Sequence, residues 1–148
     1  MTELSHVDET GGLRMVDVGG KPLSRRRALA AGRVRMAAET ARRLGELPKG
    51  DALVAAQLAG VLAAKRTAEL VPLCHPLPLT RIDVRCSVDA DGVRIEAEVE
   101  TTARTGVEME ALTAVSVAAL TVYDMAKAID PTMEIGPIRL VEKEKSPA

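Results

Sequence analysis

Ionisable side chains stand at both ends of one long apolar stretch, which runs from Gly106 to Asp130. Glu108 and Glu110 open this stretch, and Asp124 and Lys127 close it. Carboxylates and amines can move protons at a reacting centre when their pKa values lie near the working pH. Asp124 and Lys127 have i,i+3 spacing, so a helix would place them on one face and close enough to couple.

Candidate binding groups also occur outside the long stretch. His75 lies in the run VPLCHPLPL, where prolines on both sides hold it on a stiff backbone. Lys49 comes just before Asp51, a good N-cap, and therefore precedes a helix start that would favour an anion. The arginines of Arg25–Arg27 form a compact cluster whose guanidinium groups could contact a phosphate.

Each of these features also has an ordinary structural interpretation. Acidic residues near a helix start and a lysine near its end suit the helix dipole without any catalytic role. Lys49, His75 and the arginine cluster could likewise be solvated or purely structural. On position alone, the long stretch is more simply a core helix with two solvated ends. Glu110 and Asp124 would lie about 21 Å apart along it, so one straight helix cannot join them in one small site.

The composition excludes several classes of partner. The chain has 148 residues, with 20 Lys and Arg against 21 Asp and Glu, so no overall field favours nucleic acid or membrane. One Tyr and no Phe or Trp leave no stacking platform for single-stranded nucleic acid. Cys74 and Cys86 make no disulfide framework, and no further Cys or His cluster has the spacing of a metal site. We therefore expect no metal site. No targeting signal opens the sequence, so we also expect a cytoplasmic protein.

Hydrophobic period and turn signals indicate the elements that must position these groups. We expect strands over 13–18, 28–36, 80–88, 93–101 and 133–141, and helices over 37–47, 52–70 and 107–130. Asp91-Gly92 is a hairpin turn between two of the strands. This order is a split βαβ pattern, so we predict an α+β fold of ferredoxin-like type: an antiparallel four-stranded sheet with helices packed on one face.

Further expectations concern the boundaries and surfaces of this domain. Residues 1–12 are predicted to be a flexible arm, 13–143 the single domain, and 144–148 a disordered tail. Pro137 indicates an edge position or a bulge in the last strand. The glutamates at 96, 98 and 100 share one strand face, which is most simply the solvent face. The main helices have more apolar surface than one sheet can cover, which favours a symmetric homo-oligomer.

Several stretches occur together and in order: LSHVDETGGLRMVDV, KGDALVAAQLAGVLAAKRTAELVPLCHPL, TGVEMEALTAVSVAALTVYDMAKAID and MEIGPIRLVEK. Together they closely resemble the cyclic pyranopterin monophosphate synthase family, the molybdenum cofactor biosynthesis protein C family. The resemblance runs from about Leu4 to Lys143. Each motif alone is weak, whereas all of them at matching spacing are very specific.

The resemblance implies a lyase of molybdenum cofactor (molybdopterin) biosynthesis. The family converts 3′,8-cyclo-7,8-dihydroguanosine 5′-triphosphate, a purine-derived nucleotide, to cyclic pyranopterin monophosphate and releases pyrophosphate. It forms hexamers, trimers of dimers, with active sites at the dimer interface. The same assembly is therefore expected here. No resident cofactor is implied, although Mg²⁺ could arrive with the triphosphate.

The resemblance also carries over site residues. The expected catalytic residues are Asp124, Lys127, Lys49, His75 and Glu110; the expected substrate-binding residues are Leu73, Cys74, His75, Met109, Glu110, Glu108 and Arg26. We predict that Asp124 and Lys127 form the acid–base pair, because desolvation can lower the pKa of a lysine beside a carboxylate. Lys49 and Arg26 would supply positive charge for the triphosphate and the departing pyrophosphate. His75 and Glu110 could handle protons at the ring.

These roles reverse the interpretation of the long helix, because its two ends must then serve two different pockets. We define the Glu110 half-site as Glu110 with His75, and the Asp124 half-site as Asp124 with Lys127 and Lys49. We predict that each pocket joins the Glu110 half-site of one subunit to the Asp124 half-site of its twofold partner.

Two other classes of function stay open. One is a nucleotide-sensing module that would bind a triphosphate through Arg26 and Lys49 without turning it over. The other is an RNA-binding sheet surface, against which the absence of Phe and Trp argues.

Overall fold

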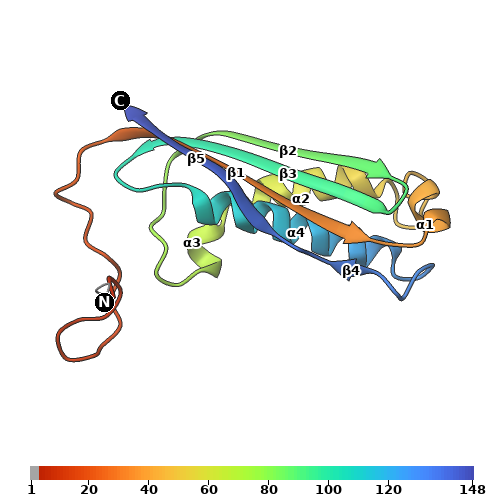
Figure 1. The fold of residues 1–148 in the computed structure, drawn as a ribbon, viewed down its shortest axis with the longest axis horizontal. Coiled ribbons are helices and arrows are strands. Elements are labelled where there is room, and N and C mark those ends of the chain that lie inside the picture. The colour runs from red at the N-terminus through yellow and green to blue at the C-terminus, as the bar shows by residue number, and fades with distance from the viewer. Residues whose placement is uncertain (1–3) are drawn as a thin grey trace.

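The computed structural model describes residues 4–148, and Figure 1 shows two long helices lying along one face of a twisted sheet. The elements are β1 (Ser24–Arg35), α1 (Ala38–Arg42), α2 (Ala52–Lys65), α3 (Thr67–Leu70), β2 (Leu79–Asp89), β3 (Gly92–Ala103), α4 (Glu108–Ala126), β4 (Glu134–Ile135) and β5 (Arg139–Pro147). The long helices are α2 and α4. They pack against each other as well as against the sheet.

Every pairing in the sheet is antiparallel, and the strands lie in the order β2-β3-β1 with β4 and β5 both along the far edge of β1. β4 pairs with Val34 and Arg35, and β5 pairs with the part of β1 from Ser24 to Ala31. The sheet therefore has four rows, although it has five strands. This is the arrangement of a ferredoxin-like α+β fold and confirms the predicted class.

The outer row is interrupted between β4 and β5. Gly136 has a φ of 119° there, which a side chain would disfavour, and Pro137 has no N–H to donate to a ladder. The predicted irregularity at Pro137 is thus confirmed.

The predicted disordered tail is wrong. β5 continues to Pro147, and its residues 142–147 pair with the first half of β1. The charged composition of this segment suggested solvation, but β1 would otherwise present a row of unpaired backbone groups. The strand expected from residue 28 also begins earlier, at Ser24, so the arginine cluster lies inside β1.

Other element boundaries also differ from expectation, and the helix expected over 107–130 ends at Ala126 as α4. Residues 14–18 form no strand, and Leu13 makes only an isolated bridge with Val7. The helix expected over 37–47 ends at Arg42. The helix expected to reach residue 70 divides into α2 and α3, where the Thr67 hydroxyl bonds to carbonyl oxygens of the preceding turn.

Helix α4 is the centre of the core. By length and composition it could cross a membrane, but here one face packs against β1 and β3. The core around it is built from small side chains, so the helix approaches the sheet closely. A Cβ added to Gly32 would lie only 2.6 Å from Val115 Cγ1, and one on Gly60 would lie 3.1 Å from the Ala114 carbonyl oxygen. This close packing fixes both ends of α4 relative to the sheet.

The face of the sheet opposite the helices carries charge, as expected, but it is not uniformly solvated. Glu98 is only 9% exposed, because Arg27 and Arg81 cover it from the neighbouring strands. The Arg27 guanidinium lies 2.8 Å from Glu98 Oε2 and lowers the pKa of that carboxyl. The prediction that all three glutamates face solvent is therefore wrong for Glu98.

Candidate active site

A cavity of about 420 Å³ lies at the end of the sheet where α4 begins. The first turn of α4, the loop after α3 and the N-terminal segment meet around it. Five predicted substrate-binding residues line it: Leu73, Cys74, His75, Glu108 and Met109. In Figure 1 the N-terminal segment lies beyond this end of the sheet, and residues such as Val16 form part of the wall.

Glu110 lies behind this cavity, one helical position beyond Met109. Its residue is 3% exposed, and it lines a smaller cavity of about 150 Å³ that His75 also borders. Oε1 has no hydrogen-bond partner among residues 4–148, and Oε2 is 3.9 Å from Cys74 Sγ. Burial raises the pKa of Glu110 to about 7, and the charge of Glu108 adds to this. Glu110 can therefore either hold or release a proton near neutral pH.

The loop after α3 is held by contacts to the N-terminal segment and to α4. His75 Nε2 lies 2.6 Å from the Val16 carbonyl oxygen, so Nε2 carries the proton and donates it. Burial raises the pKa of Cys74 to about 11, with Glu110 contributing next. The thiol therefore stays protonated at neutral pH and is not a thiolate nucleophile.

The Asp124 half-site lies at the opposite end of α4. Lys127 Nζ is 2.9 Å from Asp124 Oδ1, and Lys49 Nζ is 2.9 Å from Asp124 Oδ2. The sequence places Lys49 here because Asp51 caps α2 through Leu53 N at 2.9 Å and thereby ends the loop. All three charged side chains are more than half exposed.

The pKa shifts in this half-site differ from those expected of an acid–base pair. Hydrogen bonds from Lys127 and then Lys49 lower the pKa of Asp124 to about 2. The pKa of Lys127 is raised by Asp124, whereas desolvation was expected to lower it. The single chain leaves both groups in water, so neither titrates near neutral pH until something covers them.

The two half-sites do not meet within one chain. Fourteen helical steps separate Glu110 from Asp124 on α4, which corresponds to about 21 Å. None of Lys49, Asp124 and Lys127 lines either cavity beside Glu110. The predicted separation of the two groups is therefore present in the structure.

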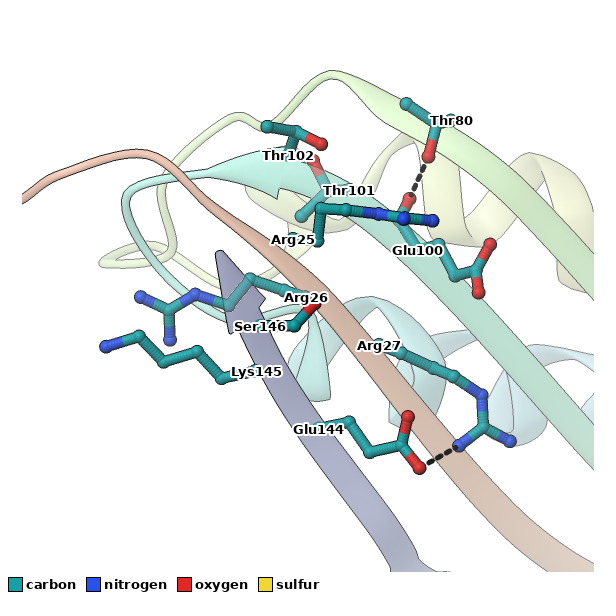
Figure 2. Close-up of a pocket in the computed structure, with 10 residues that line it drawn as sticks. All are labelled: Arg25, Arg26, Arg27, Thr80, Glu100, Thr101, Thr102, Glu144, Lys145 and Ser146. Atoms are coloured by element: carbon teal, nitrogen blue, oxygen red, sulfur yellow. Dashed lines mark hydrogen bonds and ion pairs between the residues drawn. The ribbon is translucent and has the colours of Figure 1, made fainter. Parts of the chain in front are cut away.

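Arg26 lies near the cavity but does not line it. Its Nη2 donates to the Arg104 carbonyl oxygen at 3.4 Å, and the next residue, Thr105, is part of the cavity wall. Figure 2 shows Arg26 extending beside Lys145, its register partner on β5, and Arg27 extending the other way to Glu144. These residues surround a separate hollow of about 400 Å³ at the end of the sheet.

Sequence reasoning missed several polar residues of the cavity. Lys21 and His6 line it. His6 lies in the segment before residue 13, which was interpreted as a mobile arm. Lys143 Nζ lies 3.7 Å from Glu108 Oε1, because β5 brings the end of the chain back to α4. The available signals were the stretches LSHVDETGGLRMVDV and MEIGPIRLVEK, which contain His6 and Lys143. Across residues 4–148 no group of three or more His, Cys, Asp or Glu side chains is placed to hold a metal ion.

Comparison with known proteins links this geometry to one family. The model of the MoaC family matches residues 15–146. Several curated relatives carry the name cyclic pyranopterin monophosphate synthase. That of Roseiflexus castenholzii is 60% identical over 147 residues, covering 97% of this chain and 93% of its own. That of Thermomicrobium roseum is 59% identical, with 97% and 89% covered, and that of Heliobacterium modesticaldum is 58% identical, with 97% and 92% covered.

Proposed function

The chain belongs to the MoaC family, and we propose on that basis that it is a cyclic pyranopterin monophosphate synthase of molybdenum cofactor biosynthesis. It converts 3′,8-cyclo-7,8-dihydroguanosine 5′-triphosphate to cyclic pyranopterin monophosphate and releases pyrophosphate, which makes it a lyase. The observation that carries the proposal is the extent of the match over residues 15–146. That range includes every candidate site residue from Arg26 to Lys127.

The cavity beside Glu110 suits the ring system of such a substrate. Its volume of about 420 Å³ lies in the range of small-molecule sites. Lys21 in its wall and Lys143 beside Glu108 add positive charge at the mouth. Glu110, with a pKa of about 7, serves as the proton carrier at the ring. Its orphaned Oε1 is free to accept a hydrogen bond from the base.

The complete site joins two subunits. The Asp124 half-site of one subunit covers the Glu110 half-site of its twofold partner, where Lys49 and Lys127 bind the phosphates. Exclusion of water there lowers the pKa of Lys127 and allows it to act with Asp124 as an acid–base pair. The assembly is a hexamer, a trimer of dimers. The apolar residues that α2 and α4 leave exposed support an oligomer: Val54, Leu58, Leu62 and Leu120.

Further properties follow from this assignment. We propose no resident cofactor for the site; Mg²⁺ could arrive with the triphosphate, but no ligand motif supports it. The balanced charge of the chain agrees with a small-molecule substrate rather than nucleic acid. The cytoplasmic location stays a prediction from the sequence.

Incubation of the purified protein with the cyclised dihydroguanosine triphosphate tests the proposal. We expect pyrophosphate and cyclic pyranopterin monophosphate to appear together, as followed by mass spectrometry and a pyrophosphate assay. Recovery of the bound triphosphate unchanged would instead identify a nucleotide-sensing module. Lys127→Ala should abolish turnover with the oligomer intact, and retained turnover would overturn its assigned role.

A further inference from the structure

Asp130 is a buried carboxylate, and within residues 4–148 its side chain bonds to Ala37, Thr40 and Thr132 and to no candidate-site residue. It lies just beyond Lys127, is 4% exposed, and its N–H still donates to the Ala126 carbonyl oxygen of α4 at 3.1 Å. The end of α4, the start of α1 and the approach to β4 all meet at its side chain.

The Asp130 carboxylate accepts four hydrogen bonds, all from uncharged groups. Oδ2 accepts from Ala37 N at 3.0 Å and from Thr40 Oγ1 at 2.9 Å. Oδ1 accepts from Thr132 N at 2.9 Å and from Thr132 Oγ1 at 2.7 Å. These bonds lower the pKa of Asp130 to about 2, so the carboxylate stays charged through the physiological range. α1 has no side-chain cap, and Asp130, from a distant part of the chain, instead holds the backbone N–H of its N-cap residue Ala37 and the hydroxyl of Thr40 in its first turn.

The segment that Asp130 holds at Ala37 and Thr40 leads directly to Lys49. After α1 the chain is anchored by Leu44 and Leu47, which are 1% and 5% exposed. Ala52 N donates to the Leu44 carbonyl oxygen at 3.1 Å, and Gly50 N donates to that of Leu47 at 2.9 Å. The path from α1 to Lys49 therefore has a fixed shape, and a shift of α1 against α4 would move Lys49 with it.

We propose that Asp130 is a positioning residue that sets Lys49 against Asp124 by docking the start of α1 on the end of α4. Asp124 lies in α4, and Asp130 lies just beyond its end. Lys49 comes from another segment and contacts α4 through a salt bridge between exposed side chains. Such a pair is weak by itself, so its geometry depends on the backbone that carries it. This inference rests on the proposed function, because Lys49 matters there as a phosphate ligand.

The test compares Asp130→Asn with Thr40→Val, which removes only one of the four bonds, and with Val99→Ala as a control. Val99 is a fully buried residue of β3 outside the site, so its truncation lowers stability without touching the docking. We expect kcat to fall about tenfold to a hundredfold in Asp130→Asn and less in Thr40→Val. Val99→Ala should keep kcat within about twofold despite a lower melting temperature.

Pyrophosphate binding, measured by calorimetry, separates positioning from general destabilisation. Asp130→Asn should weaken binding as Lys49→Ala does, and the double variant should bind no more weakly than Lys49→Ala alone. Additive losses, or wild-type kcat in both Asp130→Asn and Thr40→Val, would overturn the inference. If the wild-type protein turns over no substrate at all, the proposed function fails instead. The comparison of pyrophosphate binding among the two single variants and the double variant then still decides whether Asp130 positions Lys49.

Discussion

Glu110 differs from Asp124 because burial, rather than a charged partner, dominates its environment. Its pKa rises from 4.5 to about 7, so the folded protein holds a proton that the unfolded chain releases. Stability should therefore fall as pH rises from about 4.5 to about 7 and stay level above that. The penalty at full ionisation is about 3 kcal/mol. A buried group of this kind is typical of a site that uses its protonation.

Glu110→Gln should separate stability from catalysis. The variant stays neutral, so we expect it to be more stable than the wild type by up to about 3 kcal/mol at pH 8 and nearly equal at pH 4. We also expect turnover to fall at least a hundredfold at every pH. Denaturant unfolding at fixed subunit concentration and a pH–rate profile measure the two effects. Equal stability of the two proteins at pH 8 would contradict a buried, ionisable Glu110.

Asp124 presents the opposite case, a carboxylate in water whose pKa two lysines lower to about 2. Any stability it contributes is present above its unfolded pKa and disappears as pH falls toward 2, so it is complete at neutral pH. We expect Asp124→Asn to leave the melting temperature within about 2 °C and to abolish turnover. Glu39→Gln is the control, because Glu39 forms an i,i+3 pair with Arg42 that is also more than half exposed. Loss of turnover in both variants would refute a specific role for Asp124.

At the level of residues, the family resemblance marked several groups that lie close together in the structure. Cys74, His75, Glu108 and Met109, expected to bind substrate, line one cavity. Arg26 was placed less well, because adjacent strand residues point to opposite faces and a cluster of three arginines does not reveal which one faces the cavity. The raised pKa of Lys127 could not be foreseen, since solvent exposure depends on the assembly rather than on the helix pattern.

At the level of elements, α4 acts as a rigid spacer whose position depends on glycines in its neighbours. Gly32→Ala should destabilise the protein by about 1–3 kcal/mol, because the new methyl group would overlap Val115 where α4 meets β1. Gly45→Ala is the control, since nothing lies within 4 Å of its Cβ and the change should be neutral or slightly stabilising. Chemical denaturation of both variants checks this, and equal stability would mean that α4 approaches the sheet less closely.

Elements with strong local signals could be predicted, and those decided by tertiary contacts could not. The hairpin at Asp91-Gly92 and the long apolar helix followed from turn chemistry and periodicity. The continuation of the last strand over 142–147 did not, because only the unpaired edge of β1 makes a charged terminal segment extended. The start of α1 likewise depends on a contact that no local pattern encodes, since Asp130, which accepts from Ala37 N, lies far away in the sequence.

At the level of the whole molecule, the proposed assignment gives one chain two half-sites and no complete site. The rigid α4 holds them about 21 Å apart, so flexing of one subunit cannot join them. A symmetric dimer can bring the two half-sites together. Its twofold axis places the start of α4 of one subunit beside the end of α4 of the other, and this happens at two equivalent places. The exposed apolar residues of α2, such as Leu58 at 61% exposure, are available to such a contact.

Complementation between two inactive variants tests this account most directly. Glu110→Gln and Lys127→Ala subunits are dissociated, mixed in equal amounts and reassembled, and pyrophosphate release from the cyclised dihydroguanosine triphosphate is measured. A mixed dimer would contain one site with both residues intact, so random pairing should restore about a quarter of wild-type activity. Each variant reassembled alone should stay inactive. Mixed oligomers no more active than either parent would contradict a site shared between subunits.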